Sequence, residues 1–267
     1  MAMKKTLTIA GSDTSGGAGI AADLKTFQEH DVYGMTALTC IVTMDPEGWH
    51  HRVQPIDTDL VERQLETALS VGVDAVKSGM LATTDIIELA AKKLDEAKMD
   101  RYVLDPVMVC KGEDEVLQPE NTEAMREFLL PRTLVTTPNL FEAGQLAQTG
   151  PITSLEEMKE AAGKIHEYGA KNVVIKGGRN FGNETAIDLF YDGKEFTILE
   201  AEKIDTTYNH GAGCTFAAAI TANLALGKTA KDAVNDAKAF VTAAIKHGWK
   251  LNEYVGPVMH GAFNKFK

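Results

Sequence analysis

Residues 6–30, TLTIAGSDTSGGAGIAADLKTFQEH, join an apolar segment, a glycine-rich segment and an amphipathic segment in direct succession. Residues 6–10 are short and apolar, as in a buried strand. Residues 11–19 are rich in glycine, and Leu24 and Phe27 then lie on one face of a helix. The stretch predicts a strand, a ligand-binding loop and a helix, although the loop could also be a plain flexible connection. It lacks G-x-G-x-x-G, so it does not indicate a dinucleotide-binding fold.

The same alternation of strands and helices continues to the end of the chain. Strands are expected at residues 32–42, 74–78, 102–105, 134–136 and 172–176, and helices at 57–71, 85–97, 122–129 and 155–168. A hairpin around Asp192-Gly193 and three helical segments follow. This order predicts an α/β fold, a central, mostly parallel sheet with helices on both faces. Because no linker or repeat interrupts it, we expect a single domain of residues 1–267.

Composition excludes several classes of protein. The net charge of −11 argues against nucleic acid as the main partner, although a local phosphate site needs only a few amides and cations. The three cysteines, Cys40, Cys110 and Cys214, are odd in number and widely spaced, which favours free thiols in a reducing compartment. The N-terminal apolar run is too short for a signal peptide or a membrane span. We therefore expect a cytoplasmic protein without a membrane partner.

The segment His210-Gly211-Ala212-Gly213-Cys214-Thr215 opens a long alanine-rich helix. The first N–H groups of a helix have no partner within it and lie at the positive end of its dipole, so they form an anion site. The same field would favour the thiolate of Cys214. The alternative is a glycine-rich helix start with a small buried cysteine.

Polar residues gather where the expected strands end, and ligands bind at that edge of open α/β sheets. These groups are Gly11-Ser12-Asp13, Lys77-Ser78-Gly79, Asp105-Pro106, Pro138-Asn139 and Lys176-Gly177-Gly178. Lys176 is either functional or extends its charge to the surface. Asn139 and Glu142 could hold hydrated Mg²⁺ and phosphates, or could form a helix capping box.

Three further motifs leave alternatives open. Asp23 lies one helical turn after Gly19, so it either faces the same pocket or is a solvated helix residue. The segment after Asp105-Pro106 could be a lid, at about residues 107–117, or a surface loop. Leu226-Gly227-Lys228-Thr229 is similar to the end of a P-loop, but it follows a helix. We therefore expect a helix end and a new N-cap there.

Taken together, the motifs resemble the hydroxymethylpyrimidine/phosphomethylpyrimidine kinases of the ribokinase-like superfamily. The likeness covers nearly the whole chain, including Ser78-Gly79-Met80-Leu81, Asp105-Pro106-Val107-Met108 and the turn at residues 210–215. Within that group the chain is most similar to the pyridoxal kinases of this type from Gram-positive bacteria. Met44 stands where pyrimidine kinases carry a ring-binding Gln, and Cys110 and Cys214 also favour the pyridoxal kinases.

The resemblance implies ATP-dependent phosphorylation of the 5′-hydroxyl of pyridoxal, and also of pyridoxine or pyridoxamine, in vitamin B6 salvage. Cys214 would accept the hydroxyl proton, and Cys110 would add to the 4′-aldehyde as a hemithioacetal. The backbone amides of Gly211 and Gly213 would hold the transferring phosphoryl group. The resemblance also implies Mg²⁺ as cofactor and a homodimer.

The remaining site residues carried over from the family fall into three sets. The substrate-binding set is Gly11, Ser12, Asp23, Met44, Met80, Val107 and His210. The ATP-binding set is Asn139, Glu142, Lys176, Asp188 and Gly213. The metal set is Asp105 and Glu142, acting through water.

Two other functions stay open from the sequence. The chain could be a hydroxymethylpyrimidine/phosphomethylpyrimidine kinase of thiamin biosynthesis, since few pocket positions separate the two activities. It could also be a non-catalytic vitamin-binding protein on the same fold, although the complete turn at residues 211–214 and Lys176 argue against this.

Overall fold

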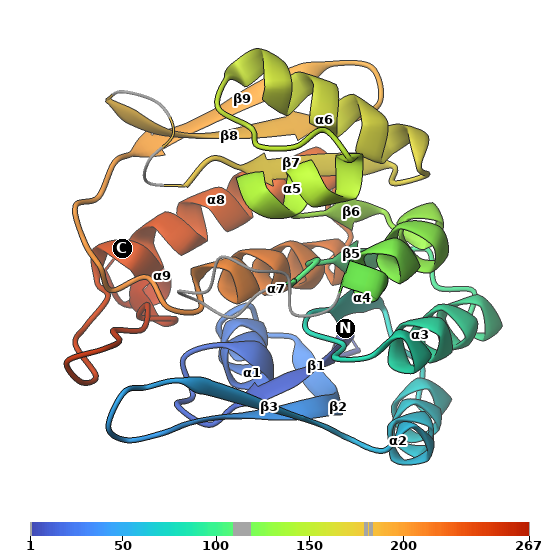
Figure 1. The fold of residues 1–267 in the computed structure, drawn as a ribbon. Helices are drawn as coiled ribbons and strands as arrows, with labels where there is room; N and C mark the ends of the chain where they lie inside the picture. The colour runs from blue at the N-terminus through green and yellow to red at the C-terminus, as the bar shows by residue number, and fades with distance from the viewer. Residues whose placement is uncertain (1, 109–118, 179–180, 182–183, 267) are drawn as a thin grey trace.

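A computed structural model describes residues 2–108, 119–178, 181 and 184–266. In this part of the chain, strands build one sheet with the order β3-β2-β1-β4-β5-β6-β7-β8-β9 (Figure 1). The strands are β1 (Lys5–Asp13), β2 (Tyr33–Met44), β3 (His51–Pro55), β4 (Ala75–Ser78), β5 (Tyr102–Leu104), β6 (Val135–Thr136), β7 (Asn172–Lys176), β8 (Thr185–Tyr191) and β9 (Phe196–Glu202).

The centre of the sheet is parallel and its edges are antiparallel. Strands β2, β1, β4, β5, β6 and β7 pair in parallel, whereas β3, β8 and β9 pair antiparallel. The chain leaves β1 towards β2 on one side and later returns to place β4 on the other side. This reversal of direction leaves a crevice at the carboxyl ends of β1 and β4, where open α/β sheets bind ligands.

Helices cover both faces of the sheet (Figure 1). One face carries α2 (Thr58–Ser70), α3 (Thr84–Glu96), α4 (Pro119–Ala124), the π-helical turn η1 (Met125–Leu129), the 3-10 turn η2 (Leu130–Arg132), α5 (Leu140–Ala147) and α6 (Leu155–Glu167). The other face carries α1 (Gly19–Glu29), α7 (Ala212–Ala225), α8 (Ala230–Lys246) and the short α9 (Ala262–Lys265).

Side chains of successive residues in the central strands point alternately to the two faces of the sheet. Tyr102 and Leu104 of β5 belong to the core under α2–α6, whereas Val103 belongs to the core under α7 and α8. All three side chains are buried. Such strands, buried on both faces, are continuously apolar, and this explains why the chain shows few alternating strand patterns at its centre. Full burial of a large apolar side chain stabilises the fold by about 1.5–3 kcal/mol.

The α/β architecture expected from the sequence is confirmed, with two local differences. β1 continues to Asp13 instead of ending near Ala10, because residues 12 and 13 pair with β2 after a register shift. The edge strand β3 is not among the strands expected from the sequence. Gly227 and Thr229 do end one helix and cap the next, with Thr229 Oγ1 accepting a hydrogen bond from the Asp232 N–H.

Most of the expected lid at residues 107–117 lies outside the described residues, as does Cys110. No helix among the described residues combines the length and the apolar character that a membrane span needs.

Candidate active site

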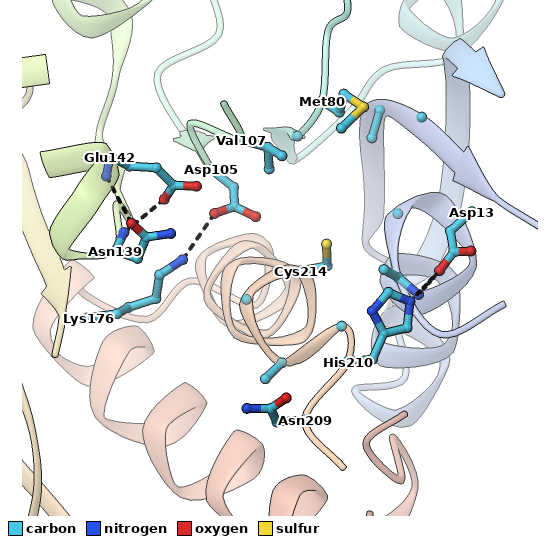
Figure 2. Close-up of a pocket in the computed structure, with 18 of the residues that line it drawn as sticks. Asp13, Met80, Asp105, Val107, Asn139, Glu142, Lys176, Asn209, His210 and Cys214 are labelled. Atoms are coloured by element: carbon cyan, nitrogen blue, oxygen red, sulfur yellow. Dashed lines mark hydrogen bonds and ion pairs between the residues drawn. The ribbon is translucent and has the colours of Figure 1, made fainter. Parts of the chain in front are cut away.

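A cavity of about 670 Å³ opens at the carboxyl edge of the sheet. Its walls come from the ends of β1, β4 and β7, from the segments after β5 and β6, and from the first turn of α7 (Figure 2). Polar and charged side chains from distant parts of the chain meet there: Asp13, Lys77, Asp105, Asn139, Glu142, Lys176, Asn209, His210 and Cys214. The strand-end groups identified in the sequence therefore do lie together, as expected.

The turn before α7 depends on glycine. Gly211 has φ +80°, and a Cβ built on it would lie 1.8 Å from the Gly17 carbonyl oxygen, so no side chain fits. The Ala212 N–H is already bonded to the Asn209 carbonyl. The following amides, those of Gly213 and Cys214, belong to the first helical turn and have no carbonyl one turn earlier to bind. Unpaired amides at the start of a helix can bind an anion, so this end of α7 is a candidate anion site.

Lys176 and Asp105 lie at the side of the cavity nearest Gly213. Lys176 Nζ is 3.3 Å from Asp105 Oδ1, which also accepts a hydrogen bond from Thr137 Oγ1 at 3.1 Å. The same Nζ lies 3.4 Å from the position of a Cβ on Gly213, so the ammonium is held beside the start of α7. This arrangement can bind an anion between a cation and helix amides. We call Lys176, Asp105 and Glu142 the phosphate side of the cavity.

Asn139 and Glu142 form the capping box that the sequence offered as one alternative. Each side chain accepts a 2.8 Å hydrogen bond from the backbone N–H of the other, which is a capping box at the start of α5. Both residues also line the cavity. Burial, with a smaller contribution from Asp105, raises the pKa of Glu142 to about 7, although Lys176 opposes the shift. The carboxyl groups of Asp105 and Glu142 lie at the same side of the cavity, and together they could bind a cation.

Asp13 and His210 form a pair at the opposite side of the cavity. His210 Nε2 is 2.6 Å from Asp13 Oδ2, and the N–H groups of Ser15 and Ala18 also donate to this carboxylate (Figure 2). Burial opposes ionisation, but the hydrogen bonds from His210 and Ser15 lower the pKa of Asp13 to about 2. The ionised carboxylate thereby fixes the His210 ring at the cavity wall.

Lys77 and Asp23 form an ion pair beneath this side. Lys77 Nζ lies 2.9 Å from Asp23 Oδ2, and neither side chain has exposed surface. Thr8 Oγ1 donates to the same oxygen at 2.6 Å. Asp23 is therefore paired below the cavity, and Lys77 is the residue that lines it. We call Lys77, Asp23, Asp13, His210 and Cys214 the acceptor side.

Cys214 lies on the cavity wall with its sulfur directed into the cavity (Figure 2). Burial raises the pKa of this thiol to about 11, although Lys77 and the Gly19 N–H act in the opposite direction. The sequence identified an effect that favours the thiolate, but burial of the thiol acts in the opposite direction and is larger. The free-energy cost of placing an anion in this cavity exceeds the benefit from the helix end.

The other expected site residues take different places. Gly11, Met80 and Val107 line the cavity, whereas Ser12, Asp23 and Met44 are not among its lining residues. Met44 ends β2 opposite His51, which does line it.

Asp188 lies outside the main cavity. It accepts the Gly177 N–H at 3.0 Å and pairs with Lys238 Nζ at 2.6 Å. It borders a second cavity of about 200 Å³, which shares Lys176, Gly178, Asn209, Ala212 and Gly213 with the main one.

Asp13 and Lys77 are site residues that the sequence did not single out. Both belong to strand-end groups that the sequence did mark, and that position was the available signal. Their partners, His210 and Asp23, lie far away along the chain, and no spacing rule connects them.

The mostly parallel sheet with the site at its carboxyl edge has the architecture of the kinases of the ribokinase-like fold, as the similarity to solved kinase structures shows. The phosphomethylpyrimidine kinase family model matches residues 13–259. The chain belongs to this family.

Two curated relatives cover nearly the whole chain. A pyridoxine kinase of Bacillus subtilis is 58% identical over 264 residues, which are 98% of this chain and 97% of the relative. A hydroxymethylpyrimidine/phosphomethylpyrimidine kinase of the same organism is 42% identical over 267 residues, 99% of this chain and 97% of the relative.

The solved structure of the pyridoxal kinase from Staphylococcus aureus with AMP-PCP and pyridoxal is also similar. Its TM-score is 0.95 at 56% sequence identity, with 100% of this chain and 97% of that chain covered.

Proposed function

We propose that the protein transfers the γ-phosphoryl group of ATP to the 5′-hydroxyl of pyridoxal. The observation that carries the proposal is the position of Cys214, at the start of the anion-binding helix and between two lysine-containing clusters in one cavity. The similarity to a pyridoxal kinase bound to AMP-PCP and pyridoxal, and to a pyridoxine kinase, supports the choice of substrate.

The phosphate side is suited to the triphosphate of ATP. Lys176 and the amides of Gly213 and Cys214 converge on one place, where they would neutralise the charge of the transferring group. The second cavity adjoins this place and shares Gly178 and Asn209 with the main one, so it offers room for the nucleoside. Asp188 supports that wall by holding the Gly177 N–H and Lys238.

Mg²⁺ fits the donor set at the same side. Asp105 and Glu142 offer hard carboxylate oxygens, and their mutual repulsion would be relieved by a cation. Among the described residues no group of three or more metal-ligating side chains occurs, which favours a contact through water. When bound, the ion would neutralise charge on the ATP phosphates.

Cys214 would act as the base towards the 5′-hydroxyl. Its thiolate accepts the hydroxyl proton while the hydroxyl oxygen bonds to the γ-phosphorus and the bond to the ADP oxygen breaks. ADP leaves with that electron pair, and the thiol later releases its proton to water. With the thiol pKa at about 11, the thiolate is on the order of one molecule in ten thousand near pH 7. Only this fraction can act as the base. The hydroxyl is far less acidic than a thiol, so its proton is transferred late, as the new P–O bond forms.

The acceptor side would hold the pyridine ring. Asp13 fixes His210, which would border the ring and its aldehyde, and Met80 and Val107 supply apolar wall. Cys110, outside the described residues, would add to the aldehyde. Its sulfur forms a C–S bond at the carbonyl carbon, and the carbonyl oxygen takes up a proton to give a hemithioacetal.

A kinetic comparison tests the proposed substrate. Purified protein with ATP and Mg²⁺ is assayed on pyridoxal, pyridoxine and hydroxymethylpyrimidine under matched conditions. We expect the largest kcat/KM on pyridoxal. The absorbance of the pyridoxal phosphate that forms is the readout for this substrate. A larger kcat/KM on hydroxymethylpyrimidine would assign the chain to thiamin synthesis, and ligand binding without ATP turnover would indicate a binding protein.

The Cys110→Ala variant tests the aldehyde adduct. We expect turnover of pyridoxal to fall while turnover of pyridoxine, which lacks the aldehyde, stays near that of the unaltered protein. Equal losses on both substrates would remove the hemithioacetal from the mechanism. The homodimer expected from the resemblance is a separate proposal, and light scattering of the purified protein tests it.

A further inference from the structure

The ion pair between Lys77 and Asp23 takes no part in the steps described above. Both side chains are fully buried, and Asp23 Oδ2 accepts hydrogen bonds from Lys77 Nζ and Thr8 Oγ1. Asp23 Oδ1 has no hydrogen-bond partner among the described residues. Burying two charges is costly, and an apolar pair of similar volume is often as stable. The pair therefore calls for a role other than stability.

The fold brings this pair to Cys214. Lys77 is in β4 and lines the same cavity as Cys214, and Asp23 is in α1, which packs against both β1 and α7. A Cβ built on Gly79 would lie 3.2 Å from Lys77 Nζ. The ammonium group therefore lies close against the backbone of Gly79, which has no side chain. The backbone N–H of Gly19, the first residue of α1, also acts on the Cys214 thiol and lowers its pKa. The start of α1 and the end of β4 thus approach the thiol together.

The charges that face Cys214 come from four elements. They are Lys77 of β4, Asp23 of α1, Asp105 after β5 and Lys176 of β7. Among the charged groups that act on the thiol, Lys77 has the largest effect and favours the thiolate, whereas Asp23 and Asp105 oppose it. Burial disfavours the ammonium, but Asp23 raises the pKa of Lys77 above its ordinary value, so Lys77 stays charged. Charge interactions are strong in such a poorly solvated cavity.

We propose that Lys77 is the positioning cation of Cys214: held in place by Asp23, it offsets the negative charge that Sγ carries when Cys214 has lost its proton. The inference rests on the proposed function, in which Cys214 accepts the hydroxyl proton. Asp23 fixes the ammonium and cancels part of its field. In this scheme Lys77 acts on the reaction through Cys214.

The Lys77→Met variant removes the cation at similar volume. The readout is alkylation of Cys214 by iodoacetamide between about pH 7 and pH 9, without ATP or pyridoxal, followed by mass analysis of the peptide that contains Cys214. If the thiol pKa rises by one unit, the thiolate fraction falls about tenfold. The alkylation rate should fall about threefold to fourfold, because a more basic thiolate is a better nucleophile. We expect kcat on pyridoxal to fall in parallel, and Lys77→Arg to recover part of both losses.

A double variant controls for folding, since Lys77→Met alone leaves the Asp23 carboxylate buried without a counter-ion. Lys77→Met with Asp23→Asn removes both charges at nearly constant shape. We expect it to unfold near the temperature of the unaltered protein and still to show a slower Cys214 alkylation, because Lys77 acts on the thiol more strongly than Asp23 does. An unchanged alkylation profile in this folded double variant, or full recovery of turnover, would overturn the proposal.

The two readouts separate this inference from the proposed function. Slower alkylation with unchanged turnover would support the action of Lys77 on the thiol and would remove Cys214 as the base. Unchanged alkylation in the Lys77 variants, together with inactive Cys214→Ala, would leave Cys214 as the base and refute the role of Lys77.

Discussion

Lys77 and Lys176 both line the cavity beside the start of α7, yet their surroundings differ. The Lys77 side chain is fully buried and pairs with Asp23 at 2.9 Å, whereas Lys176 is 18% exposed and its nitrogen lies 3.3 Å from Asp105. A short, enclosed pair holds its charge in one place. A longer, open pair can exchange its carboxylate for an incoming phosphate. The comparison indicates that one lysine is set to act on a protein group and the other on a ligand.

Removal of the Cys214 thiol should have the largest effect on turnover. For Cys214→Ala we expect kcat to fall by about a hundredfold to ten-thousandfold on pyridoxal and pyridoxine alike, as for loss of a general base. The KM for ATP should stay near its original value, since the backbone amides remain. Steady-state kinetics measure both quantities. Substantial residual turnover would contradict the role of Cys214 as the base.

The phosphate side should respond next. For Lys176→Met we expect kcat/KM for ATP to fall by about a hundredfold, because a cation aimed at the transferring group is lost. Alkylation of Cys214 without ATP should change less than in Lys77→Met. The exposed Lys171, just before β7, provides the matched control Lys171→Met, for which we expect no change. If Lys176→Met slowed alkylation as much as Lys77→Met, the distinction between the lysines would fail.

Replacement of Asp13 should have a smaller effect, which is on the free energy of unfolding and depends on pH. Its pKa of about 2 lies below the ordinary value of 3.8, so the ionised carboxylate stabilises the folded state above about pH 4. This contribution, about 2 kcal/mol, disappears as the pH falls from 4 through 2. For Asp13→Asn we expect a matching loss in the free energy of unfolding at pH 7 and a smaller loss at pH 3. Denaturant titrations at pH 7 and pH 3 measure the two losses. Equal losses in the free energy of unfolding at the two pH values would contradict the role of the ionised carboxylate.

The smallest effect should come from Met44, which lies outside the cavity lining at the far end of β2. For Met44→Gln we expect the ratio of kcat/KM on pyridoxal and hydroxymethylpyrimidine to change by less than about threefold, which is under 1 kcal/mol. Competition assays with both substrates measure the ratio. A larger shift towards hydroxymethylpyrimidine would show that Met44 reaches the substrate and would extend the acceptor side to the β2–β3 hairpin.

The sequence predicted the elements whose signals are local. Buried parallel strands are short apolar runs, and polar residues at their ends mark the site edge, as Asp105 and Lys176 illustrate. The edge strand β3 escaped notice because Arg52 and Gln54 are exposed and polar, so the run is not apolar enough to be recognised.

The electrostatics of the site could not be predicted in the same way. Lys77 and Asp23 are 54 residues apart, and only the packing of α1 on the sheet brings them together. The position of Cys214 at a helix start indicates a field that favours the thiolate, but the opposing cost of burial depends on the whole cavity and cannot be read from one segment. Asn139 and Glu142 seemed to require a choice between capping and binding, and the structure shows that the capping box itself lines the cavity.

The close approach of Gly211 to the Gly17 carbonyl has a consequence for how the enzyme is made. His210 bonds to Asp13 across 197 residues, and the His210 strand bridge to Pro257 lies later still. Contacts between such distant positions form late, since a long loop must close first. A nascent chain can therefore assemble most of its sheet during synthesis while its anion turn is still missing. The binding site is completed only when nearly the whole polypeptide has left the ribosome.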